Sequence, residues 1–240
     1  MNNIKNFREL ASQIKNKDGK TIKKQMIFRS GELTFADEND LNKLYQYQIR
    51  RIYDLRSLGE REQSPVNHKI DVVGFDVTNS KASAKMDNAF LEKIAPNANG
   101  FMLMLYQDYL AFSPILKPLM QQVIKEKDPF LFHCAAGKDR TGVVGTLIMA
   151  ILGFTEESMI LEYDQLDERV IIGAEEGLRK QGLSEELIKQ LRPLNGVDPM
   201  FIKAFIQAIK NKYQTLDRYL NEFLELSDDQ IHTFQMNFLE

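Results

Sequence analysis

Short apolar segments alternate with amphipathic stretches along the first two thirds of the chain. Four of these segments are bounded by polar turns, which is typical of strands. The last, "PFLFH", is a bare apolar run of the kind found in strands that are covered on both faces. Because helical stretches separate the strands, the pattern predicts an α/β fold with a central, largely parallel sheet of about four or five strands flanked by helices. The expected strands are residues 24–29, 50–55, 69–77 and 129–133.

Capping residues mark the expected helix starts. Thr34, with Asp37 three residues later, predicts the start of a helix that has an apolar stripe. After the last strand all the signals are helical, so residues 155–240 are expected to form a helical half that packs on the sheet. The first stripe comprises Leu41, Leu44, Tyr45 and Ile49, and the later starts are Thr155, Ser184, Asp198 and Ser227.

The segment 78–118 is the hardest to interpret. It begins with a polar, loop-like stretch and continues into "FMLMLYQDYLAF", a helical pattern with apolar residues around much of its surface. Such stripes are usually core. The position of the segment between the third strand and the cysteine strand also suits a lid-like insertion over a site. With no linker or repeat in the chain, residues 1–240 are expected to form a single domain.

Composition narrows the classes of function. The net charge is −3, so no global field would attract nucleic acid or a membrane surface. One cysteine and three scattered histidines indicate no disulfide, no metal site and no cofactor. The longest apolar run, residues 143–152, is half the length that a bilayer span needs, so stable membrane insertion is not expected. The N-terminus has no signal-peptide core, which favours the cytoplasm and leaves signal-less secretion open.

The single cysteine lies in "FHCAAGKDRTG", between a strand and an apolar helix. In such a turn, successive backbone N–H groups can converge on one anion, which the positive end of the helix also faces. Gly137 allows close backbone approach, and Arg140 can bind two oxygens with its guanidinium. The same field stabilises a thiolate. The turn therefore predicts Cys134 as a nucleophile beneath a bound phosphate.

Three other interpretations of the turn are weaker. An inert core cysteine does not explain the surrounding pattern of histidine, glycine, arginine and threonine. A nucleotide-binding P-loop would need glycine where Phe132 stands and Ser or Thr where Asp139 stands. A thiol-relay reductase would need a second cysteine.

The turn resembles the HC-x5-R-[ST] signature of the cysteine-dependent phosphatases. "CAAGKDRTG" is similar to bacterial tyrosine/dual-specificity phosphatases related to phosphoinositide phosphatases, also called triple-specificity enzymes. "NFREL" (residues 6–10), "FRSGEL" (28–33) and "YDLRS" (53–57) resemble further elements of that family in order. The resemblance covers about the first 170 residues and implies a phosphatase-like sheet.

This resemblance implies that Cys134 forms a phosphocysteine, which water then hydrolyses. Arg140 and the loop amides would bind the equatorial oxygens, and Thr141 would donate to the thiolate. His133 would orient the loop, and Lys138 would add charge at the rim, where it helps to hold a second phosphate in phosphoinositide-active relatives. The substrate-binding set is then Ala135, Ala136, Gly137, Lys138 and Thr141.

Two aspartates are candidates for the general acid. Asp139 lies in the loop, and the myotubularin phosphatases are thought to use an aspartate at this position; Asp76 ends the third strand, as in the wider superfamily. Asp139 is favoured because spacing alone puts it near the phosphate. A scaffold of buried ion pairs beneath the loop is expected from Arg29, Asp54, Arg56 and Glu60.

The implied activity is phosphomonoester hydrolysis. Phosphotyrosine in proteins is the expected substrate, with phosphoserine, phosphothreonine or phosphoinositides as further possibilities, and the loop should bind phosphate or another oxyanion. Two alternatives stay open: a catalytically silent phosphate-binding module of the same fold, and sulfur transfer of the rhodanese kind.

Overall fold

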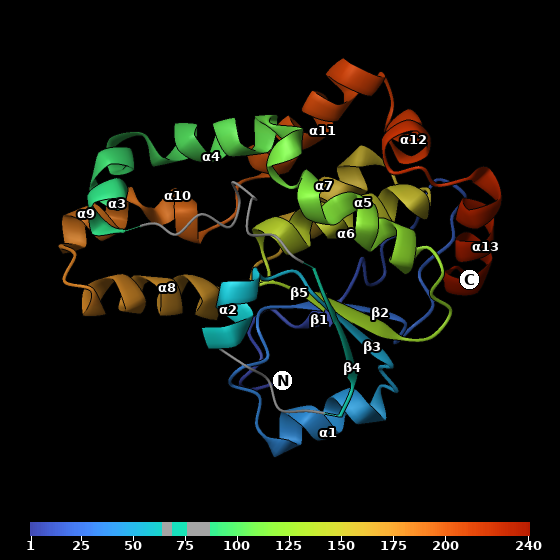
Figure 1. Cartoon of the computed structure of the whole chain (residues 1–240), viewed down its shortest axis with the longest axis horizontal. Coiled ribbons are helices and arrows are strands. Elements are labelled where there is room, and N and C mark those ends of the chain that lie inside the picture. Colours follow the sequence, from blue (N-terminus) through green and yellow to red (C-terminus); the bar gives the residue numbers. More distant parts are fainter. Residues whose placement is uncertain (64–68, 76–86) are drawn as a thin grey trace.

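The computed structural model describes residues 1–63, 69–75 and 87–240. Its centre is a five-stranded sheet in the order β1-β2-β5-β3-β4, in which only β1 is antiparallel to its neighbour (Figure 1). The prediction of a largely parallel α/β sheet is confirmed. The strands are β1 (Arg8–Glu9), β2 (Ile27–Ser30), β3 (Arg51–Asp54), β4 (Asp71–Gly74) and β5 (Phe130–His133).

The central strands are buried on both faces, which explains their apolar runs. Successive side chains of a strand point to opposite faces. On β5, Leu131 belongs to a cluster beneath α1 (Glu38–Gln46), whereas Phe130 and Phe132 belong to the main core on the other face. Helices therefore cover the sheet on both sides.

The first helix begins later than its sequence signal predicted. Asp37, and not Thr34, is the N-cap of α1, because the Asp37 side chain accepts a hydrogen bond from Asp40 N. Thr34 donates instead to the carboxylate of Glu32. Leu44 packs beneath the sheet as expected, and Ile49 joins the same cluster from beyond the end of the helix.

The main core is built around α6 (Asp139–Ile151), whose residues from Arg140 to Ile151 are all buried. This helix follows β5 directly and lies between the sheet and an outer layer of helices. The helix starts predicted at Thr155, Ser184, Asp198 and Ser227 are confirmed, since each side chain accepts a backbone hydrogen bond. The other core helices are α5 (Ser113–Val123), α7 (Glu156–Tyr163), α11 (Pro199–Tyr213), α12 (Leu216–Arg218), η4 (Tyr219–Phe223) and α13 (Asp228–Phe238).

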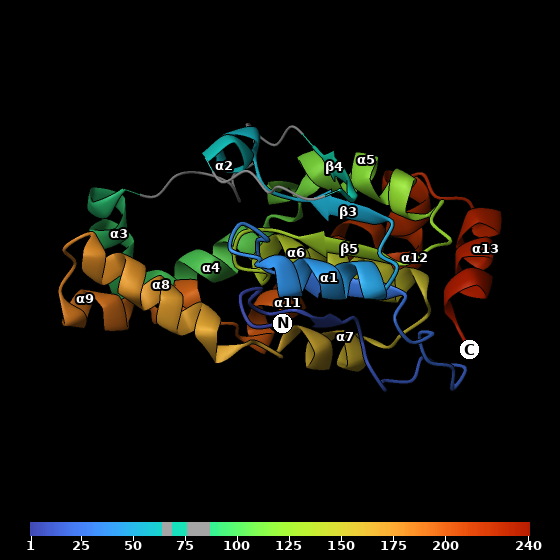
Figure 2. The same cartoon turned by 90° about the horizontal axis from the view of Figure 1, so that it is seen from below.

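A second group of helices extends beyond the edge of the sheet, at the end of the molecule away from α13 (Figures 1 and 2). It has a small apolar cluster of its own around Leu91, Ile188 and Leu191. The helical half thus packs on the sheet only in part. The group comprises α3 (Asn88–Ile94), η2 (Ala95–Asn97), α4 (Ala98–Gln107), α8 (Glu168–Lys180), α9 (Glu185–Gln190) and α10 (Arg192–Asn195).

One face of the apolar segment between the third strand and the cysteine strand contributes to the main core. Met102 and Tyr106 of α4 belong to the main core, and α4 packs along α11. The predicted helix ends at Gln107, and Asp108 caps the short η3 (Tyr109–Ala111) that follows. Residues 78–86 of the expected insertion lie outside the described residues, and its role as a lid stays a prediction.

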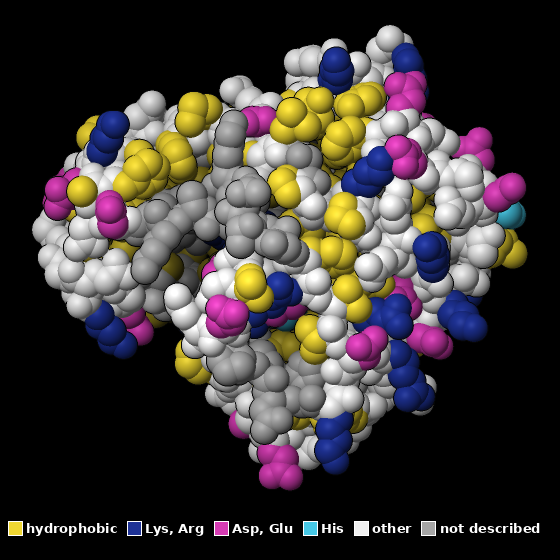
Figure 3. Space-filling view, viewed as in Figure 1, with side chains coloured by type: hydrophobic (Ala, Val, Ile, Leu, Met, Phe, Trp, Pro, Cys, Tyr) yellow, Lys and Arg dark blue, Asp and Glu magenta, His cyan; other side chains and the backbone are white. Residues whose placement is uncertain are grey.

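None of the helices among the described residues is long and apolar enough to cross a membrane. On the face shown in Figure 3, acidic and basic side chains are interspersed and no continuous basic surface forms. In the described part of the chain, no group of three or more His, Cys, Asp or Glu side chains could hold a metal ion.

Candidate active site

The cysteine turn begins at the carboxyl end of the central strand β5 and ends where α6 starts. His133, the last residue of β5, is paired in register with Ser30 of β2 and Asp54 of β3. Ligands of open α/β sheets bind at this edge. The parallel pairing therefore brings the segments "FRS" and "YDL", distant in sequence, to the two sides of the turn.

The carbonyl groups of the turn are held by donors from the surrounding protein. Ala135 O accepts from Glu32 N at 2.9 Å. Gly137 O accepts from Arg29 Nη2 at 2.8 Å and from Asn6 Nδ2 at 2.7 Å. A carbonyl oxygen that pointed at a bound anion would repel it, so these bonds orient the loop for anion binding.

The backbone N–H groups of the turn, unlike its carbonyl groups, have no partners in the surrounding protein that the structure describes. Within the described part of the chain, no protein oxygen accepts a hydrogen bond from the backbone N–H groups of Ala135, Ala136, Gly137, Lys138 and Asp139. The start of α6 also has no side-chain cap. Unpaired N–H groups at a helix N-terminus form an anion-binding site.

Gly137 is required by the shape of the turn. Its φ is +72°, a left-handed conformation that other residues rarely adopt. A Cβ added there would also lie 2.5 Å from Gly31 N, with the Ser30 carbonyl closer still. The turn packs this tightly on the end of β2 because no side chain intervenes.

Cys134 lies at the base of this turn with 3% of its surface exposed. Thr141 Oγ1, on the first turn of α6, donates to Cys134 Sγ at 3.2 Å. His133 Nδ1 is 3.1 Å from the carbonyl oxygen of Cys134. Thr141 and His133 thus have the contacts expected of them, one with the sulfur and the other with the loop backbone.

Arg140 is held by Glu60 of α2 (Leu58–Gln63). Arg140 Nη1 and Nη2 lie 2.8 and 2.7 Å from the two carboxylate oxygens, and Nη1 also donates to Leu55 O at 3.2 Å. Although burial disfavours the charged guanidinium, the hydrogen bonds that Arg140 donates to Glu60, followed by electrostatic interactions with the neighbouring acidic groups, raise the pKa of Arg140. Burial also raises the pKa of Glu60, but its bonds to Arg140 and Ser57 outweigh this and lower it to about 2.

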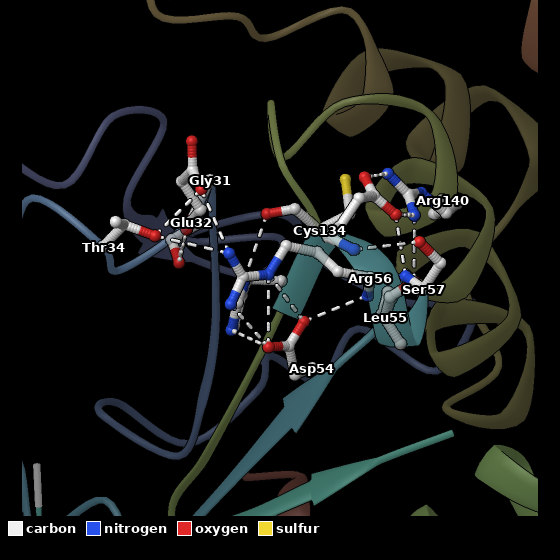
Figure 4. A network of polar contacts seen from close by, with 12 residues as sticks. Gly31, Glu32, Thr34, Asp54, Leu55, Arg56, Ser57, Cys134 and Arg140 are labelled. Atoms are coloured by element: carbon white, nitrogen blue, oxygen red, sulfur yellow. Dashed lines mark hydrogen bonds and ion pairs between the residues drawn. The ribbon is translucent and has the colours of Figure 1, made fainter. Parts of the chain in front are cut away.

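Glu60 therefore orients Arg140 directly. From the sequence, Glu60 was grouped with Asp54 and Arg56, but its main partner in the structure is Arg140. Arg56 Nη2 lies 2.8 Å from Asp54, and Arg56 Nη1 lies 3.1 Å from Glu32, the residue whose N–H holds the turn. Figure 4 shows this network beside Cys134 and Arg140. Burial opposes ionisation of Asp54, but the charge of His133 and the bonds to Arg56 lower the pKa of Asp54.

A second buried network reaches the turn from α7. Glu162, which is 3% exposed, lies 2.6 Å from Arg29 Nη1 and 3.0 Å from Arg8 Nε. Arg8 Nη1 in turn donates to Asn6 Oδ1 at 2.6 Å. Arg29, which was expected to support the turn, thus belongs to a series of polar contacts that runs from Glu162 on α7 to Gly137. Glu162 carried no sequence signal, whereas Asn6 and Arg8 belong to the "NFREL" segment.

Asp139 contacts two groups beside the turn. Tyr106 of α4 donates to Asp139 Oδ1 at 2.8 Å, and Lys138 Nζ lies 2.9 Å from Oδ2. The Tyr106 hydroxyl is also 2.9 Å from that of Tyr163. Burial, followed by the charge of Asp139, raises the pKa of Tyr106 well above its ordinary value. Nothing in the sequence pointed to either tyrosine, because both come from distant helices.

Two further predictions concerned Lys138 and Asp76. Lys138 is only 4% exposed, so it is buried against Asp139 and does not stand free at the rim. Asp76, the second candidate acid, lies outside the described residues.

Comparisons with known proteins agree with the site. The sequence profile of the tyrosine phosphatase family matches residues 1–240. A Cupriavidus necator protein assigned to the tyrosine-protein phosphatases is 25% identical over 232 residues, which cover 95% of this chain and 84% of that protein. A tyrosine-protein phosphatase of Nostoc commune is 30% identical over 136 residues, which cover 55% of this chain and 44% of that protein.

Among solved structures, TpbA of P. aeruginosa aligns with a TM-score of 0.35 at 15% identity, covering 70% of this chain and 84% of that chain. The core catalytic domain of the PP-IP phosphatase SIW14 from S. cerevisiae aligns with a TM-score of 0.31 at 16% identity, covering 80% and 92%. The assignment rests on the sequence profile, which confirms the resemblance inferred from the cysteine turn. The chain belongs to the tyrosine phosphatase family.

Proposed function

We propose that the protein is a phosphomonoester hydrolase that works through a phosphocysteine on Cys134. The observation that carries this proposal is the polarity of the turn: its N–H groups are unpaired within the described structure, while its carbonyls at residues 135 and 137 are held by scaffold donors. A tetrahedral dianion matches such a site. The family match over residues 1–240 supports one catalytic unit of that extent.

In the first step, Cys134 Sγ attacks phosphorus as the bond from phosphorus to the leaving oxygen breaks, and Asp139 gives that oxygen its proton. The amides and the Arg140 guanidinium stabilise the charge on the three equatorial oxygens. Glu60 contributes by fixing Arg140 in its bidentate orientation. Because this arrangement exists before substrate binds, little reorganisation is needed.

In the second step, Asp139 takes a proton from water, the water oxygen attacks phosphorus, and the P–S bond breaks to release phosphate and the thiolate. Thr141 supports this step because its hydroxyl already donates to Sγ at 3.2 Å. Asp139 is the acid and base that we favour, since it begins α6 beside the turn and is oriented by Tyr106. Asp76 is the alternative.

Phosphotyrosine in proteins is the substrate that we propose first, because the family is a tyrosine phosphatase family. Activity on phosphoserine, phosphothreonine or phosphoinositides would broaden this specificity. The alternative to an enzyme is a silent phosphate-binding module, but the intact pair of Cys134 and Arg140 favours catalysis.

Turnover of p-nitrophenyl phosphate by the wild type and by Cys134→Ser tests the proposal. We expect turnover in the wild type and none in Cys134→Ser, together with vanadate binding by the folded variant. Equal turnover in both proteins would refute the nucleophile. Vanadate binding without wild-type turnover would establish the silent module.

A further inference from the structure

A cavity of about 250 Å³ adjoins the cysteine turn. One wall is the turn itself, through Ala136 and its neighbours, and the opposite wall comes from α8 and α10. Its apolar lining includes Phe35, Val170, Ala174 and Leu194. Because the turn would hold the phosphoryl group, a cavity beside it is placed to receive the rest of the substrate.

Two lysines line this cavity, and their surroundings differ. Lys138 Nζ is paired with Asp139 at 2.9 Å and is buried. Lys5 is exposed, and no carboxylate among the described residues lies within ion-pair distance of its ammonium. The positive charge that is free to meet a substrate in this cavity is therefore that of Lys5.

The Lys5 ammonium lies against Gly173 of α8. A Cβ added at Gly173 would collide with the Lys5 ammonium, and Lys5 Cε would lie 3.5 Å away. One turn later on the same helix, a Cβ added at Gly177 would meet nothing within 4 Å. Gly173 thus leaves the space in which the ammonium lies, whereas Gly177 has no neighbour to accommodate.

We propose that this cavity is the leaving-group subsite, that it binds the ring of a phosphotyrosine peptide, and that Lys5 selects peptides with an acidic residue next to the phosphotyrosine. The inference rests on the proposed phosphatase function and names its substrate class. An aromatic ring matches apolar walls, because it can be desolvated there without losing hydrogen bonds. The lining also includes the polar side chains of Asn3, Glu32 and Asn195, so the comparison with inositol phosphates is left to the test below.

The test compares kcat/KM for two phosphotyrosine peptides that differ only in carrying Glu or Gln on both sides of the phosphotyrosine. For the wild type we expect a preference of about three- to fivefold for the Glu peptide, as an exposed ion pair is worth up to ~1 kcal/mol. The ratio should fall towards one in Lys5→Met and be retained in Lys5→Arg. It should also decrease with ionic strength.

Gly173→Ala and Gly177→Ala are the matched pair of variants. Both place the same methyl group inside α8 and raise its helix propensity equally. Gly173→Ala displaces the Lys5 ammonium and should reduce the Glu-to-Gln ratio, whereas Gly177→Ala should keep the wild-type ratio. A ratio reduced equally by both substitutions would overturn the role of Gly173 in seating Lys5.

Two further outcomes would overturn the subsite. One is a Glu-to-Gln ratio that is the same in Lys5→Met as in the wild type. The other is a higher kcat/KM for inositol phosphates than for the Glu peptide. Turnover of p-nitrophenyl phosphate that depends on Cys134 reports the phosphatase function separately. If this turnover is absent, the phosphatase function is refuted. If it is present but the Glu-to-Gln ratio is the same in Lys5→Met as in the wild type, only the subsite is refuted.

Discussion

The carboxylate of Glu162 lies 2.6 Å from the guanidinium of Arg29, and both side chains are at most 3% exposed. The same guanidinium donates to Gly137 O, so an acid on α7 fixes a carbonyl of the cysteine turn through one intermediate residue. The ion pair orients the turn, and its removal would leave a buried charge without its partner.

Glu162→Gln should therefore lower the free energy of unfolding by about 3 kcal/mol, because Arg29 stays buried without a counter-charge. Urea denaturation would measure this. The control is Glu222→Gln, which breaks the exposed pair between Arg218 and Glu222 and should cost less than about 1 kcal/mol. Equal losses in the two variants would contradict the structural role of Glu162.

Glu60→Gln should lower kcat/KM for p-nitrophenyl phosphate by up to about a hundredfold, because Arg140 loses the carboxylate that fixes its orientation. Steady-state kinetics would measure the loss. Glu62→Gln, an exposed substitution on the same helix, is the control and should have wild-type kinetics. A Glu60→Gln enzyme with full activity would show that Arg140 is held without Glu60.

The low pKa of Glu60 also predicts a pH dependence of stability. Its value falls from an ordinary 4.5 to about 2 in the folded protein, so the unfolded chain binds the proton more readily. The stabilisation is complete above about pH 4.5 and is lost as the pH falls towards about 2. Urea denaturation across this range should show a steeper loss for the wild type than for Glu60→Gln. Parallel curves would refute the contribution of this carboxyl.

Gly137→Ala should abolish vanadate binding and destabilise the fold, because the methyl group meets the end of β2 in addition to straining a positive φ. Gly19→Ala separates the two effects, since Gly19 has a φ of +77° with nothing within 4 Å of an added Cβ. That variant should lose about 1 kcal/mol from backbone strain alone and keep vanadate binding. Thermal unfolding and vanadate titration of both proteins would show the difference, and vanadate binding retained in Gly137→Ala would contradict it.

Tyr106→Phe tests the assignment of the general acid. It removes the hydroxyl that donates to Asp139 and keeps the buried ring. If Asp139 transfers the proton, kcat for an aryl phosphate with a poor leaving group should fall, because the carboxyl loses the hydrogen bond that orients it. An unchanged kcat in Tyr106→Phe, with activity lost in Asp76→Asn, would assign the acid to Asp76.

Several elements were determined by residues close together in the chain. The strand that ends at His133, the tight turn at Gly137 and the helix starts at Thr155 and Asp198 all follow from local propensity and capping. The first helix shows the limit of such signals. Both Thr34 and Asp37 are acceptable caps, and contacts of Thr34 with Glu32 and Arg56 decided in favour of Asp37.

The cysteine turn was predictable from its own residues, because a strand, a glycine turn and a helix start are encoded within eleven consecutive residues, 132–142. The contacts that hold the turn became visible only in the folded chain: Glu60 on Arg140, Glu162 on Arg29 and Tyr106 on Asp139. The same is true of the position of Lys5 over Gly173 in the adjoining cavity. These contacts could not be predicted because a hydrogen bond or ion pair between distant segments depends on how helices pack on the sheet. Local patterns of polar and apolar residues carry no record of that packing.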